Sequence, residues 1–167
     1  MKPLRLAVDT NVLLDLAGEV EHVIDAMAII SRRLPDTDKL VLPSVLEELA
    51  FLADSGLTQQ TRQLACKAIS QLGAERRFRP LLELAFLPAE VETLAEEFLR
   101  RDLLPKDEVH DGMILAEAAM MSCGLLLSSD EHLRSIDHQE LTWLLHRFEL
   151  APPVIATPRE IARKFFR

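Results

Sequence analysis

The stretch that decides the fold is Leu4-Arg5-Leu6-Ala7-Val8-Asp9-Thr10-Asn11, close to the N-terminus. Its first five residues are mostly apolar and do not alternate with polar ones, which is typical of a strand buried on both faces. Asp9, Thr10 and Asn11 then favour the end of the strand and the cap of a helix. We therefore expect a strand over residues 4–8, followed at once by a helix.

Two further apolar runs repeat this pattern of a short buried strand. Leu40-Val41-Leu42 ends at Pro43-Ser44, where Ser44 is expected to cap the next helix. Leu125-Leu126-Leu127 ends at Ser128-Ser129-Asp130, which again precedes a helical pattern. Both runs are therefore predicted to be strands of the same kind as the first.

The rest of the chain is mostly helical in pattern, with a last short strand, Val154-Ile155, before a capping box at residues 157–160. Helices are expected over residues 19–34, 45–54, 58–72, 81–86, 89–103, 106–122, 130–136 and 138–149. Apolar strands separated by helices predict an α/β fold of three layers, with a central parallel sheet covered on both faces. The length suits one domain over residues 1–167.

Composition and charge limit the classes of function. With 49% hydrophobic and 28% charged residues, the chain has the composition of a folded globular protein. No apolar run reaches the roughly 18 residues of a membrane span, and no signal-peptide pattern is present. We therefore expect a cytoplasmic protein with no membrane partner. The net charge of −8 disfavours broad nonspecific binding of nucleic acids, because phosphate contacts need lysine and arginine.

Other residue classes point to no competing chemistry. Cys66 and Cys123 lie in apolar helical segments and are expected to be buried thiols. The histidines fall on predicted helix surfaces, with His110 or His132 at best supporting a site, and no Ser-His-Asp, Cys-His or phosphate-binding glycine motif is present. Solvated helix ends are the preferred interpretation of the basic clusters, which are Arg32-Arg33, Arg76-Arg77-Arg79, Arg100-Arg101 and Arg159-Arg163-Lys164-Arg167.

Acidic residues fall where an open parallel sheet places its ligands, at the carboxyl ends of the strands. Asp9 directly follows the first strand, and Asp130 follows the strand over residues 125–127. Glu48 borders the core-facing stripe of the helix over residues 45–54, and Asp111 heads the core-facing stripe of the helix over residues 106–122. The four side chains are therefore expected to meet at one edge of the sheet.

Each acid taken alone has an ordinary explanation. Asp9 and Asp130 suit helix caps, Glu48 suits a solvent edge, and Asp111 suits an ion pair with Lys106. Four carboxylates at one sheet edge are costly together, because a desolvated carboxylate must be neutralised, hydrogen-bonded or bound to a cation. An all-oxygen cluster matches the preferences of Mg²⁺ and Mn²⁺. The sequence therefore predicts a Mg²⁺ or Mn²⁺ site.

The residues around these acids resemble the four motifs of the PIN-domain family of ribonucleases. They are Ala7-Val8-Asp9-Thr10-Asn11-Val12-Leu13-Leu14-Asp15, Val45-Leu46-Glu47-Glu48-Leu49, Asp111-Gly112-Met113-Ile114-Leu115-Ala116-Glu117-Ala118 and Leu126-Leu127-Ser128-Ser129-Asp130. The motifs follow the family's order, and the resemblance spans nearly the whole chain.

The resemblance implies a parallel sheet of four or five strands and hydrolysis of phosphodiester bonds in single-stranded or structured RNA. The four acids become the catalytic and metal-binding residues, and Asn11 and Ser128 orient carboxylates by hydrogen bonding. Many members are toxins of VapBC-type toxin–antitoxin pairs, which are commonly dimeric and held inactive by a small antitoxin. A homodimer and a small antitoxin partner are therefore expected.

The chain departs from the family pattern in two places. The helical stretch from about Gly56 to Pro105 is longer than in the compact toxins, and Ser128 stands where the family usually has threonine. One turn before Asp111, Asp107 and Glu108 are expected to favour the helix dipole, with an additional supporting ligand as the alternative.

Two other functions remain as alternatives. A receiver-like signalling domain also gathers acids and Mg²⁺ at the edge of a parallel sheet, but it needs an acidic pair after the first strand and a late lysine. A catalytically degenerate PIN-like domain would bind RNA or protein without cleaving, but such domains tend to lose acids, and all four are present here.

Overall fold

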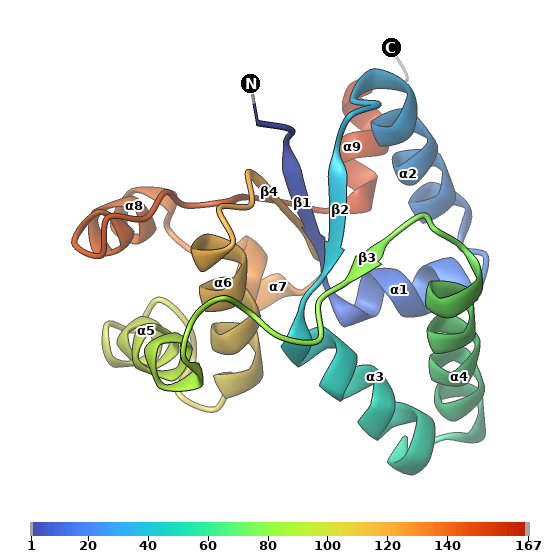
Figure 1. The fold of residues 1–167 in the computed structure, drawn as a ribbon, viewed down its shortest axis with the longest axis horizontal. Helices are drawn as coiled ribbons and strands as arrows, with labels where there is room; N and C mark the ends of the chain where they lie inside the picture. Colours follow the sequence, from blue (N-terminus) through green and yellow to red (C-terminus); the bar gives the residue numbers. More distant parts are fainter. Residues whose placement is uncertain (1, 166–167) are drawn as a thin grey trace.

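Five short strands form one parallel sheet in the computed structural model, which describes residues 2–165 (Figure 1). The strands are β1 (Arg5–Val8), β2 (Asp38–Val41), β3 (Arg79–Pro80), β4 (Leu125–Leu127) and β5 (Val154–Ala156). Their order across the sheet is β3-β2-β1-β4-β5, and every neighbouring pair is parallel. The predicted α/β fold with a parallel sheet is confirmed.

Helices join the strands and cover both faces of the sheet. They are α1 (Thr10–Ala17), α2 (Glu21–Arg33), α3 (Pro43–Ser55), α4 (Gln59–Ala74), α5 (Pro88–Arg100), α6 (Val109–Met120), α7 (Glu131–Arg134), α8 (His138–His146) and α9 (Pro158–Phe165). Figure 1 shows α5, α6 and α8 on one side of the sheet and α1, α2 and α9 on the other. The predicted three-layer arrangement is therefore present.

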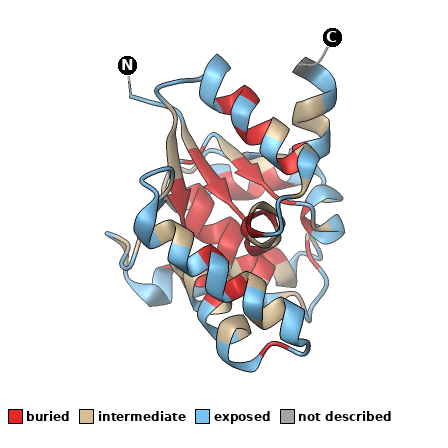
Figure 2. Cartoon of the chain, turned by 90° about the vertical axis from the view of Figure 1, so that its right-hand side faces the viewer, coloured by how far each residue is buried: buried red, intermediate tan, exposed pale blue. Residues whose placement is uncertain are grey.

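The two central strands are buried because apolar side chains cover both of their faces. Leu6, Ala7 and Val8 of β1 are fully buried, as are Leu126 and Leu127 of β4. Figure 2 shows this buried core at the centre, with exposed helix surfaces around it. Burying one such leucine contributes about 1.5–3 kcal/mol. The core thus anchors the strands whose ends carry the predicted site.

Backbone hydrogen bonds align the carboxyl ends of the central strands. The amide of Asp9 donates to the carbonyl of Leu127 at 2.9 Å, and the amide of Ser128 donates to the carbonyl of Ala156 at 3.1 Å. Asp9 and Ser128 therefore leave the sheet side by side, at the edge where parallel sheets bind ligands.

The segment from Arg79 to Pro88 differs from its prediction. A short helix was expected over residues 81–86, but these residues form bends and irregular backbone, and Arg79–Pro80 form the edge strand β3. The amide of Leu81 donates to the carbonyl of Val41 at 2.9 Å, so the backbone bonds to the end of β2 instead of to itself. So short a helix between two prolines has too few internal bonds to form alone.

The cap of α3 also differs from its prediction. Leu42 occupies the cap position and Pro43 the first helical position, so Ser44 already lies inside the helix. Proline is favoured at this first position because its fixed φ suits the helix. The backbone N–H that proline lacks would have no partner within the helix at this position. The prediction that Ser44 caps the helix is therefore wrong.

Two smaller points concern single residues. Cys66 on α4 is exposed, contrary to the predicted buried thiol, because α4 packs through Ala65 and Ala68, whereas Cys123 is buried as predicted. Arg167 of the last basic cluster lies outside the described residues.

Between residues 2 and 165, no helix has both the length and the apolar character to cross a membrane.

Candidate metal centre

Asp9 caps the first turn of α1 and is held by three hydrogen bonds. Its Oδ1 accepts from the amide of Thr10 at 2.6 Å, and its Oδ2 accepts from Asn11 Nδ2 at 3.0 Å and from Ser128 Oγ at 2.6 Å. The residue is only 4% exposed. Burial raises its pKa, the bonds from Ser128 and Thr10 oppose this, and the charges of two other acids add to it. Both residues predicted to orient carboxylates, Asn11 and Ser128, contact Asp9.

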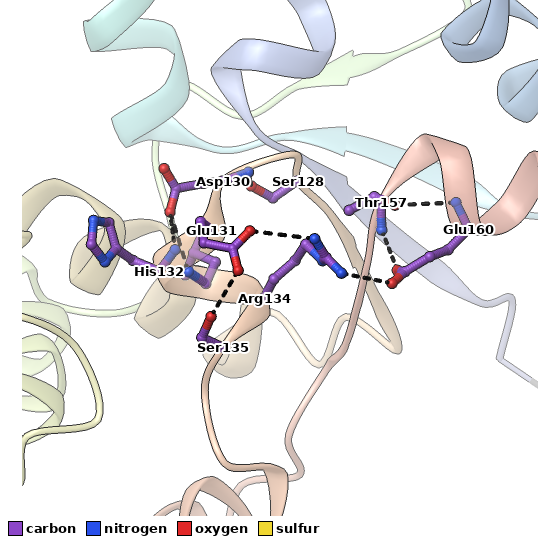
Figure 3. A network of polar contacts seen from close by, with 9 residues as sticks. Ser128, Asp130, Glu131, His132, Arg134, Ser135, Thr157 and Glu160 are labelled. Atoms are coloured by element: carbon purple, nitrogen blue, oxygen red, sulfur yellow. Dashed lines mark hydrogen bonds and ion pairs between the residues drawn. The ribbon is translucent and has the colours of Figure 1, made fainter.

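Asp130 lies at the same edge and is linked to Asp9 through Ser128. Ser128 Oγ, which donates to Asp9, also accepts from the amide of Asp130 at 3.0 Å. Asp130 caps α7, with Oδ1 accepting from the amides of His132 at 2.7 Å and Leu133 at 3.2 Å. Figure 3 shows this carboxylate at the start of α7, pointing away from Ser128. Asp130 Oδ2 accepts no hydrogen bond from the described residues.

An exposed ion-pair network links α7 to α9. Arg134 donates to Glu131 at 3.3 Å and to Glu160 at 3.4 Å, as Figure 3 shows. The predicted capping box of α9 is present: Thr157 accepts from the amide of Glu160 at 3.1 Å, and the Glu160 carboxylate accepts from the amide of Thr157 at 2.8 Å. The helix that Asp130 caps therefore lies beside the start of α9, which directly follows β5.

Asp111 lies in the first turn of α6 and is the least satisfied of the four acids. It is 9% exposed, and its Oδ2 is buried without a hydrogen-bond partner in the described part of the chain. Burial raises its pKa to about 8, and the neighbouring carboxylates of Asp130, Asp9 and Glu108 add to this effect. Asp111 and Asp130 are thus close enough to influence each other's ionisation.

Glu48 on α3 contacts one residue of α1 and one residue of α6. Its Oε2 accepts a hydrogen bond from Thr10 Oγ1 and lies 2.8 Å from His110 Nε2. Burial favours a higher pKa for Glu48, but the hydrogen bonds from His110 and Thr10 outweigh it and lower the pKa. The charge of Glu48 also helps to raise the pKa of Asp9, so the two carboxylates are neighbours.

The two acids before α6 behave differently from each other. Asp107 is exposed and forms no hydrogen bond or ion pair with any residue described. Glu108 is half-buried, helps to raise the Asp111 pKa, and pairs with His132 Nε2 at 3.4 Å. Glu108 is therefore the nearer of the two to the cluster, although Asp107 was the predicted supporting residue.

Sequence reasoning missed a buried acid that connects α6 to α3. Glu117 is 4% exposed, its Oε1 accepts from Ser44 Oγ at 2.7 Å, and its Oε2 accepts from the amide of Ser44 at 3.2 Å. Burial raises the pKa of Glu117, and the two bonds from Ser44 oppose it. This contact fixes the start of α3 against α6. Glu48 lies on α3, and Asp111 lies on α6. One signal was available, because Glu117 is the only charged residue from Gly112 to Met120.

The four predicted acids thus lie at one edge of the sheet and act on one another electrostatically. Within residues 2–165, however, no three His, Cys, Asp or Glu side chains already surround a common point in ligating positions. Arginines from two predicted basic clusters pair with nearby acids, Arg79 with Asp38 and Arg100 with Glu97, as expected of solvated surface residues.

The comparisons with known proteins concern the fold. No protein-family model and no curated protein matches the sequence. Among solved structures, the chain is similar to one chain in a crystal structure of VapBC2 from Rickettsia felis. In that structure VapBC2 is bound to a DNA fragment from its promoter. The TM-score is 0.63 at 12% sequence identity, and the match covers 92% of this chain and 98% of that chain. At this identity the likeness supports a PIN-like fold and leaves the chemistry to the site itself.

Proposed function

We propose that the chain is a divalent-metal-dependent ribonuclease, which hydrolyses RNA phosphodiester bonds with Mg²⁺ or Mn²⁺ held by Asp9, Glu48, Asp111 and Asp130. The observation that carries the proposal is Asp111. Its buried Oδ2 has no partner in the described residues, and its pKa is raised to about 8 by burial and by neighbouring acids. Such a group is stabilised by a cation, which would replace the proton that it otherwise keeps.

The side chains present fit a hard divalent cation. All four are carboxylates, which Mg²⁺ and Mn²⁺ prefer over nitrogen or sulfur ligands. Asp111 Oδ2, Asp130 Oδ2 and Glu48 Oε1 accept no hydrogen bond from the described residues, so each has an oxygen free to ligate. Mg²⁺ keeps several water ligands, so it does not require every carboxylate to contact it directly.

The chain's own residues would prepare the site for hydrolysis. When bound, a divalent ion lowers the pKa of a water and stabilises charge on phosphoryl oxygens. Ser128 and Asn11 keep Asp9 in one orientation, so its carboxylate does not have to be ordered during the reaction. Asp111 must lose its proton for the site to form, so binding of the ion is expected to strengthen as pH rises.

The likeness to VapBC2 supports a narrower version of the proposal. We infer that the chain is the toxin of a toxin–antitoxin pair, forms a homodimer and binds a small antitoxin. Purification from the native host tests this version, because it predicts a small protein present in equal amount. A chain that purifies alone and as a monomer would contradict it.

The fold argues against the receiver-like alternative. Receiver domains have the strand order 2-1-3-4-5, whereas the order here is β3-β2-β1-β4-β5. The degenerate PIN-like alternative shares this fold and differs only in lacking cleavage. Activity therefore has to separate it from the proposed nuclease.

The deciding experiment is cleavage of an end-labelled RNA with Mn²⁺ or Mg²⁺, and with EDTA. We expect cleavage only with the metal, its loss in Asp111→Asn, and no loss in the matched variant Asp107→Asn, which removes an exposed carboxylate near the same helix end. Cleavage that persists in EDTA or in Asp111→Asn would overturn the proposal. Tight RNA binding without cleavage would favour the degenerate domain.

A further inference from the structure

One carboxylate of the candidate site is held through a single oxygen by residues of two other helices. Both contacts of Glu48 use Oε2: Thr10 Oγ1 donates to it, and His110 Nε2 lies 2.8 Å away. Thr10 belongs to the first turn of α1, Glu48 to α3 and His110 to the first turn of α6. Three helices from distant parts of the chain therefore meet at this atom.

The arrangement leaves the second oxygen of Glu48 available. Oε1 accepts no hydrogen bond from the described residues, and the Glu48 side chain is 32% exposed. A glutamate side chain has high rotamer freedom, and fixing it in one conformation costs conformational entropy. If the hydrogen bonds to Oε2 already fix the side chain, less of this cost falls on ion binding.

An ordinary surface ion pair does not explain the contact as well. Such pairs are formed by exposed, mobile side chains and contribute little. Here one of the two donors is Thr10, which is only 3% exposed and cannot turn its hydroxyl to solvent. His110 directly precedes Asp111 in the sequence. The histidine that contacts Glu48 is therefore the neighbour of Asp111, whose Oδ2 has no hydrogen-bond partner in the described residues.

We propose that Thr10 and His110 are positioning residues, which fix Glu48 through Oε2 so that Oε1 is available to the divalent ion. The inference rests on the proposed function, because it assigns these two residues to the same site. It explains why a buried threonine hydroxyl and an imidazole converge on one atom of a carboxylate. Neither residue is required to contact the ion, the RNA or the reacting water.

The affinity for Mn²⁺, measured by calorimetry and by the electron paramagnetic resonance of free Mn²⁺ at one fixed pH, tests the proposal without any activity assay. Removing an outer hydrogen-bond partner of a metal ligand typically weakens binding about 10-fold or more. We therefore expect the Kd to rise about 10-fold in His110→Ala and in Thr10→Val. His110→Gln, which keeps an N–H donor at similar reach, should recover most of the loss, as should Thr10→Ser.

Two further variants separate positioning from general effects. Because His110 is argued to act through Glu48, adding His110→Ala to Glu48→Gln should weaken binding no further than Glu48→Gln alone. His132→Ala is the matched control, because His132 pairs with Glu108 instead of Glu48 and should leave the Kd unchanged. Both His110 and His132 are partly exposed, so neither substitution removes a buried side chain.

The possible results distinguish this inference from the proposed function. If the wild type binds Mn²⁺ and both His110→Ala and Thr10→Val bind equally well, the positioning role is overturned while the metal site stands. Additive effects of His110→Ala and Glu48→Gln would also overturn it. If the wild type binds no Mn²⁺, the metal site itself fails, and the inference fails with it.

Discussion

Replacing Asp111 by asparagine is expected to stabilise the metal-free protein while it removes the proposed activity. In the folded chain the pKa of Asp111 is raised from 3.8 to about 8 by burial and by Asp130, Asp9 and Glu108. At pH 7 the unfolded chain loses this proton and the folded chain keeps it. From the unfolded pKa of 3.8 to pH 7 is about 3 pH units, which at 1.36 kcal/mol each corresponds to roughly 4 kcal/mol as an upper value.

The same shift fixes the direction of the pH dependence. Because the folded pKa is raised, the folded protein binds more protons than the unfolded chain between pH 3.8 and about 8. The stability of the metal-free wild type therefore falls as pH rises through this window. Asparagine cannot ionise, so the advantage of Asp111→Asn should be roughly 2 kcal/mol larger at about pH 8 than at about pH 6.

Urea denaturation in EDTA at several pH values measures this effect. The matched control Asp107→Asn removes an exposed carboxylate and should change stability by less than about 0.5 kcal/mol. Mn²⁺ at about 100 times its Kd should add about 2.7 kcal/mol to the wild type, and much less to Asp111→Asn. An Asp111→Asn variant that is less stable than the wild type in EDTA at every pH, or whose gain does not change with pH, would refute the reasoning.

Three other perturbations test the contacts around the site and the core. Ser128→Ala removes a fully buried hydroxyl that bridges two of the acids, and urea denaturation should show a loss of about 1–3 kcal/mol. Ser44→Ala removes the donor to the buried Glu117 carboxylate and should also cost about 1–3 kcal/mol, so an unchanged midpoint would speak against this contact. Burial raises the pKa of Cys123 to about 12, so a thiol reagent should modify the exposed Cys66 in the native protein and reach Cys123 only after unfolding.

The central strands could be predicted from the sequence because their signal is local. The mostly apolar run at residues 4–8 and the apolar run at residues 125–127 have few alternatives to a buried parallel strand. The edge strand Arg79–Pro80 carries no such signal, because it is two residues long, exposed and contains proline. It forms only because the end of β2 offers it free backbone groups, so its existence depends on tertiary structure.

The acids of the site were also predictable, since their positions follow from strand ends and helical periodicity. Their hydrogen-bond partners were harder to predict. The contacts of His110 with Glu48 and of Ser44 with Glu117 join α3 to α6, and the residues in each contact lie more than 60 positions apart in the sequence. No spacing rule relates residues so far apart, so these contacts depend on how the two helices pack. Only the unusual placement of Glu117 in an apolar run offered a local signal.

Anomalous scattering from crystals of the protein soaked in Mn²⁺ tests the central claim most directly. We predict one or two strong anomalous peaks at the carboxyl edge of the sheet, within ligand distance of oxygens from Asp9, Glu48, Asp111 and Asp130. Distances close to the roughly 2.0–2.1 Å typical of Mg²⁺ are expected. No peak at this edge in saturating Mn²⁺, or a peak ligated by other side chains, would contradict the assignment of the site.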